Sequence, residues 1–348
     1  MSVTANPAVD PAHRFDEAAL SAYLAGHLAG FGGEIAVTQF QGGQSNPTYR
    51  LDSAAGPYVL RKRPAGKLLP SAHRIDREYA VMKALAGTIP VPEMLHFCED
   101  EAIIGQSFYV MEHVEGRIMP DARLLDADRT QRRQLSFEMM RVLARLHRAD
   151  PVELGLSEFG KPGVYVARQF ALWTRQYAEA KFEENEDMAR VIPWLEQRLP
   201  AEEENALVHG DYRSHNILFA PGEPRIAAVL DWEIATQGHP LSDVAYACLP
   251  YCMSDDDLKG FQGEDPAALG IPSEEEMIAA YCREAGRAEL PDWHFFLVFS
   301  LFRSAAIRAG VYRRGLDGTA ANAQGALRTG AGYRGAAAAA WRLAQQAR

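Results

Sequence analysis

The segment from Leu207 to Phe219, LVHGDYRSHNILF, places an acidic and an amide side chain close together between two apolar runs. Asp211 follows a His-Gly pair, Asn216 stands five positions later, and Asp231 comes after another apolar run. Mg²⁺ prefers hard oxygen ligands and needs only one or two of them from the protein. Two such ligands at a metal, with a separate carboxylate to take a proton from a hydroxyl, would suit phosphoryl transfer to an alcohol.

Two other interpretations of this loop remain open. Asp211 and Asn216 could simply close a turn, because both residue types often hydrogen-bond to nearby backbone. His209, Asp211 and His215 could instead hold a metal for hydrolysis, although histidines six apart in a loop lack the i, i+4 spacing of a helical zinc motif. The whole pattern, with HGD, the later Asn and the second Asp, favours phosphoryl transfer over both alternatives.

The elements that must position this loop change in character along the chain. Up to residue 114 the hydrophobic pattern predicts short strands at 34–40, 48–52, 58–63, 94–99 and 107–114, with helices at 16–31 and 74–86. A connector follows at 116–121, and the rest is mainly helical, at 130–147, 164–184, 187–199, 274–285, 293–310 and 335–348, with two short strands flanking the loop. We therefore predict an α+β fold of two lobes, a small antiparallel β-sheet lobe over 1–114 and a mainly helical lobe over 115–348.

Composition and charge exclude some classes of binding partner and cellular location. The formal net charge of −10 and the pI near 5.5 argue against a nucleic-acid partner, which needs a basic face. The four cysteines form no CxxC pair, so we expect reduced thiols. The first fifteen residues lack the pattern of a signal peptide, and the most apolar stretch, 293–306, is interrupted by His294 and Arg303. We therefore expect a cytoplasmic protein without a membrane segment.

The string HGDYRSHNILF followed by VLDWE resembles the aminoglycoside phosphotransferase and choline kinase family. The resemblance implies a bilobal protein-kinase-like fold, ATP and Mg²⁺ as cofactors, and a small-molecule hydroxyl as the substrate. It also implies that Asp211 is the catalytic base, that Asn216 and Asp231 bind Mg²⁺, and that His209 is structural. The strings GGQSNPTY, LRKRP and HRIDREY are most similar to the kinase-like domain of acyl-CoA dehydrogenase family members ten and eleven.

The same resemblance indicates two stretches of backbone that would contact ATP. One is a turn between two predicted strands, where glycine lets backbone N–H groups approach phosphates; its candidates are Gly42, Gly43, Ser45 and Asn46. The other ends the last strand of the first lobe, where a kinase hinge would offer backbone groups to adenine; its candidates are Glu112, His113 and Val114.

A cation for the phosphates is expected on the predicted strand 58–63. Arg61 stands where protein kinases carry lysine, and Lys62 follows it. Because neighbouring strand residues face opposite sides, only one of them can face ATP, and we favour Arg61. Glu78, in the following helix, is the expected partner of this cation. Both cations could instead be solvated strand residues.

The segment Gly238 to Asp243, GHPLSD, resembles the GDPL-x-D segment of the family, with His239 in place of the usual Asp. We predict that Asp243 caps a helix and braces the neighbouring loop.

These features predict an ATP- and Mg²⁺-dependent phosphotransferase that acts on a small-molecule hydroxyl. The subgroup that the chain resembles is associated with phosphorylating 4-hydroxy acids, so a hydroxy acid or its CoA ester is the favoured acceptor, and acyl-CoA dehydrogenase pathway enzymes are candidate partners. An aminoglycoside acceptor and a non-catalytic, nucleotide-binding pseudokinase are the alternatives. The oligomeric state and the choice of ATP over GTP are left open.

Overall fold

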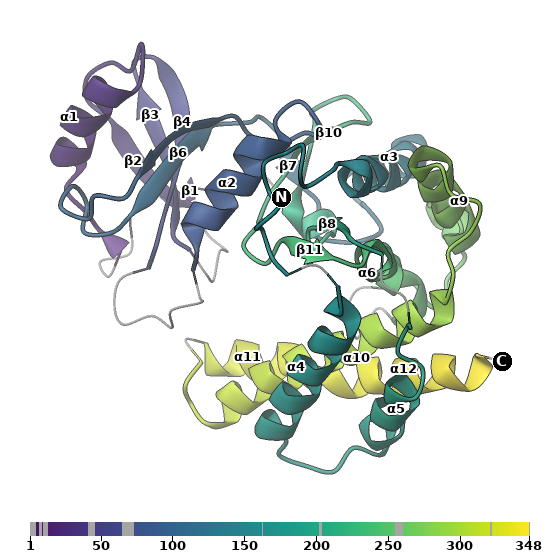
Figure 1. The fold of residues 1–348 in the computed structure, drawn as a ribbon. Coiled ribbons are helices and arrows are strands. Elements are labelled where there is room, and N and C mark those ends of the chain that lie inside the picture. Colours follow the sequence, from purple (N-terminus) through teal and green to yellow (C-terminus); the bar gives the residue numbers. More distant parts are fainter. Residues whose placement is uncertain are drawn as a thin grey trace. The chain divides into compact units, whose positions relative to one another are not determined.

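The computed structural model describes residues 5–6, 9, 13–40, 46–64, 73–161, 163–201, 204–254, 260–320 and 322–347 (Figure 1). The chain divides into two compact units. The first comprises 1–120, 154–156 and 215–235, and the second comprises 121–153, 157–214 and 236–348. This division differs from the predicted lobes 1–114 and 115–348, because the segment 215–235 returns to the first unit.

The first unit contains an antiparallel sheet with the strand order β1-β2-β3-β4-β6-β5. Its strands are β1 (Ala5–Asn6), β2 (Ala36–Phe40), β3 (Thr48–Ser53), β4 (Gly56–Lys62), β5 (Met94–Cys98) and β6 (Phe108–Glu112). Helix α1 (Glu17–His27) buries Leu20 and Leu24 in one cluster with Leu51 and Leu60 of the sheet. Helix α2 (Ile75–Leu85) contacts β5 and β6. The predicted strands and helices of this region are confirmed within a few residues.

A smaller antiparallel sheet belongs to the same unit and carries two of the predicted site residues. Its order is β10-β9-β7, with β7 (Arg117–Ile118), β9 (Ile217–Phe219) and β10 (Ile226–Val229). Asn216 directly precedes β9, and Asp231 lies two residues beyond the end of β10. Residues 116–121 were predicted to be a connector only, but they contribute β7, whose register pairs Arg117 with Phe219.

The second unit is mainly helical, as predicted. Its helices are α3 (Arg129–Arg148), α4 (Tyr165–Ala180), α5 (Glu186–Glu196), α6 (Pro240–Cys252), α8 (Pro266–Leu269), α9 (Glu274–Ala285), α10 (Trp293–Leu316), α11 (Ala323–Ala331) and α12 (Tyr333–Gln346). A two-stranded antiparallel sheet joins β8 (Ala206–Val208) to β11 (Thr236–Gly238). Helix α9 begins at a capping box of Ser273 and Glu276 and ends at Gly286 in the left-handed conformation, so both ends match the prediction.

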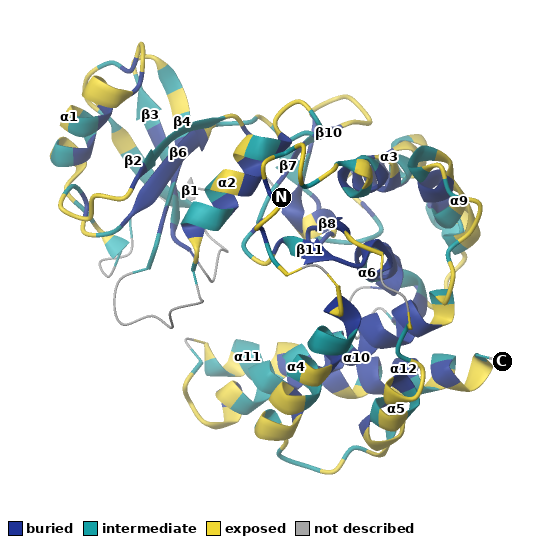
Figure 2. Ribbon diagram, viewed as in Figure 1, coloured by how far each residue is buried: buried dark blue, intermediate teal, exposed yellow. Residues whose placement is uncertain are grey.

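Helix α10 is the central helix of the second unit. It packs against α4, α6, α11 and α12, and its N-terminal half is almost entirely buried (Figure 2). It has 24 residues, from Trp293 to Leu316, and is therefore longer than the predicted stretch 293–310. By length and composition alone, it contains an apolar window that could cross a membrane. Because 67% of that window is buried inside the protein, its apolar character is accounted for by the core.

Candidate active site

Arg61 is the centre of a cluster of ion pairs in the first unit. Its Nε lies 3.0 Å from Glu78 Oε2, and its Nη2 lies 3.0 Å from Asp231 Oδ1. Glu233 Oε2 is 3.9 Å from the same Nη2. The cation comes from β4, Glu78 from α2, and the other two carboxylates from the segment after β10. The predicted pairing of Arg61 with Glu78 is confirmed, and one guanidinium faces three carboxylates; we call these four residues the Arg61 cluster.

Lys62, the other candidate cation of β4, makes different contacts. Its Nζ donates a hydrogen bond to Gln106 Oε1 at 3.0 Å and lies 5.8 Å from the centre of the Phe15 ring. The side chain is only 1% exposed, and this burial lowers the pKa of the ammonium group. Because neighbouring residues of a strand face opposite sides of the sheet, the two cations are separated, and Arg61 is the one beside Glu78 and Asp231.

The Arg61 cluster holds more negative than positive charge. Burial raises the pKa of Glu78 to about 7; Arg61 opposes this shift, and Asp231 and Glu233 add to it. Burial would lower the pKa of Arg61, but the carboxylates, Glu78 foremost, raise it above its ordinary value. A further cation placed near these carboxylates would therefore be stabilised.

The backbone joins the two predicted metal ligands. The Leu230 N–H donates to the carbonyl oxygen of Asn216 at 2.8 Å, so the residue before Asp231 is bound directly to Asn216. Asp231 has φ of 65°, a left-handed conformation that costs a non-glycine residue about 1–2 kcal/mol. Next to it Trp232 is fully buried and donates from Nε1 to the Val229 carbonyl at 3.0 Å. The hairpin thus holds Asp231 in place at some conformational cost.

This arrangement fits Mg²⁺. Asn216 and Asp231 offer hard oxygen atoms, and the carboxylate surplus of the Arg61 cluster favours a cation. In the part of the chain that the structure describes, no three His, Cys, Asp or Glu side chains are grouped to hold a metal by themselves. Mg²⁺ often takes only one or two protein ligands and completes its shell with waters and phosphates.

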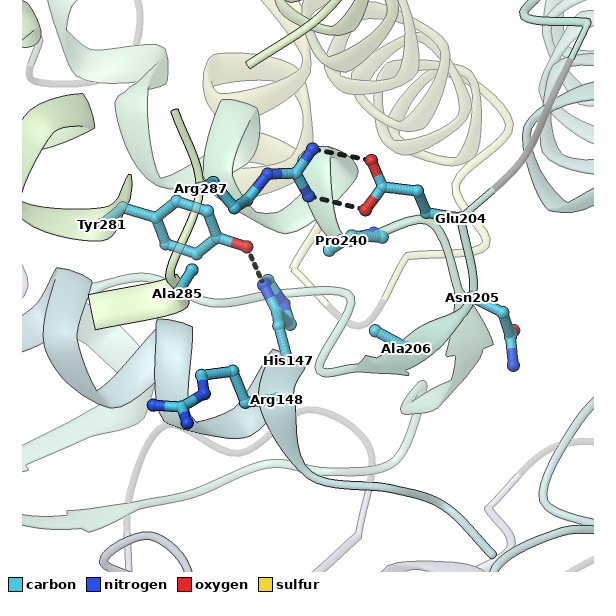
Figure 3. Close-up of a pocket in the computed structure, with 9 residues that line it drawn as sticks. All are labelled: His147, Arg148, Glu204, Asn205, Ala206, Pro240, Tyr281, Ala285 and Arg287. Carbon is cyan, nitrogen blue, oxygen red and sulfur yellow. Dashed lines mark hydrogen bonds and ion pairs between the residues drawn. The ribbon is translucent and has the colours of Figure 1, made fainter. Parts of the chain in front are cut away.

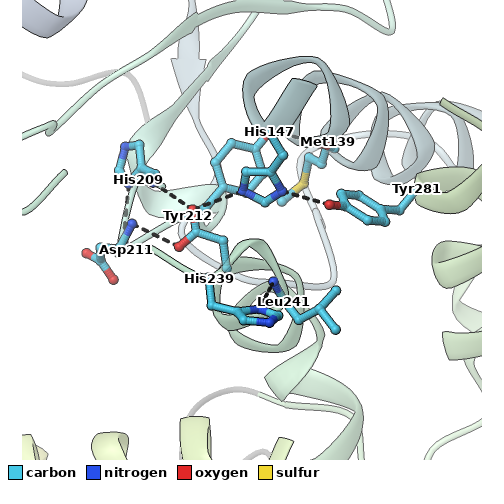
Figure 4. Close-up of polar contacts among 10 residues, drawn as sticks. Met139, His147, His209, Asp211, Tyr212, His239, Leu241 and Tyr281 are labelled. Carbon is cyan, nitrogen blue, oxygen red and sulfur yellow. Dashed lines mark hydrogen bonds and ion pairs between the residues drawn. The ribbon is translucent and has the colours of Figure 1, made fainter. Parts of the chain in front are cut away.

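In the second unit, Asp243 of α6 holds the His-Gly-Asp loop (Figure 4). Its carboxylate accepts the His209 N–H at 2.6 Å and the Gly210 N–H at 2.9 Å. Gly210 has φ of 85°, which favours glycine, and the Asp211 N–H donates to His209 Nδ1 at 3.2 Å. The predicted bracing role of Asp243 is confirmed, and His209, fully buried, helps to close the loop.

The predicted capping role of Asp243 is wrong. Helix α6 begins earlier, and its N-cap is His239, whose Nδ1 accepts the Leu241 N–H at 3.3 Å. This acceptor requires an unprotonated nitrogen, in agreement with burial, which lowers the pKa of His239 to about 4. Asp243 lies inside the first turn, which leaves its carboxylate available to the loop.

The same carboxylate also contacts His147 of α3, which Figure 4 shows beside Tyr281. Its Nε2 is 3.5 Å from Asp243 Oδ2, and its Nδ1 is 2.8 Å from the Tyr281 hydroxyl. Burial raises the pKa of Asp243, but the hydrogen bonds from His147 and from the His209 backbone outweigh it, so the pKa is lowered overall. Asp243 is thus a buried carboxylate whose ionised form is stabilised by hydrogen-bond donors of the protein. We call Asp243, His147 and the two loop N–H groups the Asp243 brace.

A cavity of about 420 Å³ lies beside His147 in the second unit (Figure 3). Arg287 and Glu204, which both line it, form a bidentate ion pair in which both N–O distances are 2.6 Å. The lining residues are His147, Arg148, Glu204, Asn205, Ala206, Pro240, Tyr281, Ala285 and Arg287. Asp211 is not among them, so this cavity adjoins the support of the loop and not the carboxylate predicted to react.

Asp211 itself is partly accessible, with 21% of its side chain exposed. Arg213 Nε lies 3.2 Å from Asp211 Oδ1, and the Tyr246 hydroxyl hydrogen-bonds to the same carboxylate. Burial, followed by the charge of Asp211, raises the pKa of Tyr246 to about 12. Tyr212 anchors the loop from the other side, since its hydroxyl donates to the Met139 carbonyl at 2.9 Å. Asp211 is therefore held in place yet open to a proton donor, as a general base requires.

Of the predicted phosphate-binding turn, Gly42, Gly43 and Ser45 lie outside the described residues. Asn46 is described and is 1% exposed. Its Oδ1 lies 3.1 Å from His73 Nδ1, and within the described ranges its buried Nδ2 has no hydrogen-bond partner. The role of this turn stays a prediction.

In the predicted hinge, the backbone N–H of Glu112 is already hydrogen-bonded within the protein. The Glu112 N–H donates to the Glu93 carbonyl at 2.9 Å, and the Glu112 carboxylate accepts the Glu93 N–H at 3.2 Å. The His113 ring contacts Arg50, with 3.1 Å between Nε2 and Nη1. Since the Glu112 amide is bonded within the sheet, adenine would have to use other backbone groups of the stretch that ends at Val114.

The model of the phosphotransferase enzyme family matches residues 36–296 of this chain, which include the Arg61 cluster and the Asp243 brace. The chain belongs to this family. Acyl-CoA dehydrogenase family member 10 of Mus musculus is 45% identical over 309 residues, which are 88% of this chain and 29% of that protein. Acyl-CoA dehydrogenase family member 11 of Homo sapiens is 44% identical over 315 residues, 88% of this chain and 40% of that protein. The chain thus spans less than half the length of these relatives.

Solved structures of the family agree with the fold. A Ralstonia eutropha protein provisionally named an aminoglycoside phosphotransferase superposes with a TM-score of 0.88 at 43% identity and covers 96% of this chain and 100% of its own. Spectinomycin phosphotransferase, in complex with ADP and spectinomycin, superposes with a TM-score of 0.63 at 13% identity, covering 97% and 100%. The predicted α+β, bilobal kinase-like fold and the family resemblance are therefore confirmed.

Several residues near the candidate site of this phosphotransferase were not predicted from its sequence. Glu233 could have been suspected, because it stands two positions after Asp231 and shares its turn. Arg213 has the same relation to Asp211. Tyr246 and His147 lie far from the loop in the chain, on α6 and α3, and no local pattern connects them with it.

Proposed function

We propose that this chain transfers the γ-phosphoryl group of ATP, as a Mg²⁺ complex, to a hydroxyl of a small molecule. The observation that carries the proposal is Arg61, which pairs at 3.0 Å both with Glu78 of a helix and with Asp231 of a hairpin. In protein kinases a strand cation pairs with a helix glutamate, and a nearby aspartate binds Mg²⁺. The Arg61 cluster combines the same three kinds of group, with arginine replacing lysine.

Each residue then has a defined task. Arg61, oriented by Glu78, contacts the phosphates of the nucleotide, and Asn216 and Asp231 hold Mg²⁺. The metal, when bound, neutralises phosphate charge and orients the γ-phosphoryl group. Asp211 accepts the proton of the acceptor hydroxyl. At the same time, the oxygen of that hydroxyl forms a bond to the γ-phosphorus, and the bond between this phosphorus and ADP breaks. The exposed fraction of Asp211 and its contacts with Arg213 and Tyr246 support this role.

The nucleotide is supported by the relatives of known structure. Spectinomycin phosphotransferase was solved with ADP, and an aminoglycoside 2'-phosphotransferase-IIIa was solved with GDP. We therefore expect a purine nucleotide here and propose ATP. The resemblance to the acyl-CoA dehydrogenase family members supports a hydroxy acid or its CoA ester as the acceptor and an association with acyl-CoA dehydrogenases, since this chain matches only 29–40% of their length.

ADP formation, measured with Mg²⁺ and a panel of hydroxy acids, CoA thioesters of hydroxy acids, amino alcohols and aminoglycosides, tests this proposal. We expect turnover with a hydroxy acid or its thioester. Asp211→Asn should abolish it and leave the Kd for ATP within about twofold, because a base does not hold the nucleotide. Glu223→Gln is a matched control, since its exposed carboxylate pairs only with Arg225 among the described residues. ATP binding without turnover on any acceptor would instead indicate a pseudokinase.

A further inference from the structure

A second cation, Arg303, is connected to the predicted base of the second unit through Tyr246. Arg303 projects from α10, and its guanidinium carbon is 5.6 Å from the centre of the Trp173 ring and 5.4 Å from that of Tyr246. Tyr246 also hydrogen-bonds to Asp211 through its hydroxyl. The same tyrosine therefore contacts the predicted base and this arginine, and all four residues belong to one unit.

The guanidinium of Arg303 is positioned by its faces and not by a carboxylate. Over the described ranges, Arg303 has no ion pair, and its buried Nε has no hydrogen-bond partner. Rings at the faces of a guanidinium contribute cation–π attraction and leave its in-plane N–H groups free to bind oxygen. An arginine held in this way, against the same tyrosine that contacts the predicted base, is arranged to receive a ligand.

Two other cations of α10 are already engaged. Arg308 Nη1 donates to the Thr329 carbonyl at 3.3 Å, and Arg313 Nε pairs with Asp317 at 2.9 Å. Arg303 therefore differs from them in what it contacts as well as in its place near Asp211.

We propose that Arg303 is the specificity-determining residue of the acceptor site and that it binds an oxygen of the acceptor's carboxyl group. The oxygen belongs either to the carboxylate of a free hydroxy acid or to the carbonyl of its thioester. This rests on the proposed function, because it assigns the acceptor end of the same transfer. Bound at Arg303, the acceptor presents its hydroxyl to Asp211.

The same geometry disfavours a polycationic acceptor. Trp173 and Tyr246 are the aromatic faces that an ammonium group would use, and the chain's own guanidinium already occupies them. Arg213, 3.2 Å from Asp211, adds a second positive charge near the base. An aminoglycoside would be repelled by both arginines.

Matched acceptors test the proposal. The probes are 4-hydroxypentanoate, its CoA thioester, and 1,4-pentanediol, which keeps the secondary hydroxyl and lacks the carboxyl group. Binding of each is measured by isothermal titration calorimetry, and KM and kcat are measured from ADP formation. In Arg303→Gln we expect at least tenfold weaker binding and higher KM for the acid or the thioester, a kcat within threefold, and little change for the diol.

Two further variants complete the design. Arg303→Lys keeps the charge and the stem, so it should lose less affinity than the glutamine variant, and its thermal unfolding checks that the fold survives. Arg313→Gln, on the same helix, is the control and should bind the probes as the unaltered chain does. Loss confined to the acid identifies the carboxylate, and loss with the thioester identifies the carbonyl; either supports the proposal.

The proposal is overturned if the unaltered chain binds neither the acid nor the thioester, or if Arg303→Gln weakens the diol as much as the acid. It is also overturned if Arg303→Gln leaves all three affinities unchanged. The proposed function fails separately, when no acceptor of the panel yields ADP although ATP binds. Acid binding that depends on Arg303 without any turnover would keep Arg303 as a carboxyl-binding residue and refute the phosphoryl transfer.

Discussion

The Arg61 cluster of the first unit and the Asp243 brace of the second unit balance charge in opposite ways. In the cluster, three carboxylates share one guanidinium, and the pKa of the buried Glu78 rises to about 7. In the brace, one carboxylate receives two backbone N–H groups and faces an imidazole, and its pKa falls below the ordinary value. The cluster has more carboxylates than cations, whereas the carboxylate of the brace is surrounded by hydrogen-bond donors.

This difference separates a site whose charge is balanced only when a ligand binds from one whose carboxylate is already satisfied by the protein. Perturbed pKa values caused by burial and by unbalanced carboxylates are typical of functional sites. A carboxylate whose bonds all come from the protein instead fixes the backbone around it. We therefore expect changes in the cluster to alter ligand binding and changes in the brace to alter stability.

The largest effect is expected for Asp243→Ala. The substitution leaves the N–H groups of His209 and Gly210 buried without their acceptor, and each such group costs about 1–3 kcal/mol. We expect the free energy of unfolding, from urea titration, to fall by about 3 kcal/mol. At a temperature where the variant stays folded, its Kd for ATP should change less than twofold.

Ser242→Ala is the control for this experiment. Ser242 is the buried neighbour of Asp243 on α6, and within the described part of the chain its hydroxyl has no hydrogen-bond partner. Its replacement should change the unfolding free energy by less than about 0.5 kcal/mol. Equal losses in both variants would show that the loop is not held by the Asp243 carboxylate.

The next largest effect is expected for Asp231→Ala, and it should appear in ATP binding and not in stability. With its oxygen removed, the Kd for ATP in the presence of Mg²⁺ should rise about 100-fold, equivalent to about 2.7 kcal/mol. In EDTA the Kd should change little, because the metal no longer contributes. The fold should survive, since Glu78 and Glu233 still face Arg61. Isothermal titration calorimetry with and without Mg²⁺ measures both values, and an unchanged Kd with Mg²⁺ would exclude Asp231 as a metal ligand.

The sequence predicted the elements with clear periodicity and the residues of the contiguous motifs. The alternation of β4 separated Arg61 from Lys62, and the capped helix α9 was predicted from 274 to 285, as observed. Of helix α6 only the start was predicted, and it was placed at Asp243 although the helix begins at Pro240. Its extent was not predicted, because Pro250 lies inside it and proline is unfavourable in a helix interior. Helix α11 escaped notice because it contains glycine within a short span.

What the sequence could not predict depends on contacts between distant segments. The return of residues 215–235 to the first unit follows from the pairing of β9 with β7, two strands of three and two residues. The contact of His147 with Asp243 joins positions 96 apart in the chain. No local propensity encodes such a pair, so only the folded chain reveals it.

A smaller effect is expected from His239, which caps the helix that carries Asp243. Its pKa is about 4 in the folded chain, against about 6.5 when unfolded, because burial opposes the charged form. The lowered value means that stability is full above pH 6.5 and is lost as the pH falls toward 4. Between pH 7.5 and pH 5.0 the loss from this group is about 2 kcal/mol.

His239→Asn isolates this contribution. Asparagine retains an N-cap acceptor for the Leu241 N–H and does not titrate. Urea unfolding at the two pH values should therefore show a pH dependence about 2 kcal/mol smaller in the variant than in the unaltered chain. A pH dependence equal in both chains would mean that other groups cause the acid sensitivity.

The smallest effect compares the two neighbouring cations of β4. Arg61→Met removes the cation of the cluster and should raise the Kd for ATP about tenfold, equivalent to about 1.4 kcal/mol. Lys62→Met removes a cation that contacts Gln106 and the Phe15 ring instead, so the Kd should stay within about twofold. Calorimetric titration of both variants under one ionic strength decides between them. If Lys62→Met weakened ATP as much as Arg61→Met, the contrast between the two faces of this strand would lose its functional meaning, and the nucleotide would have to contact the face that carries Lys62.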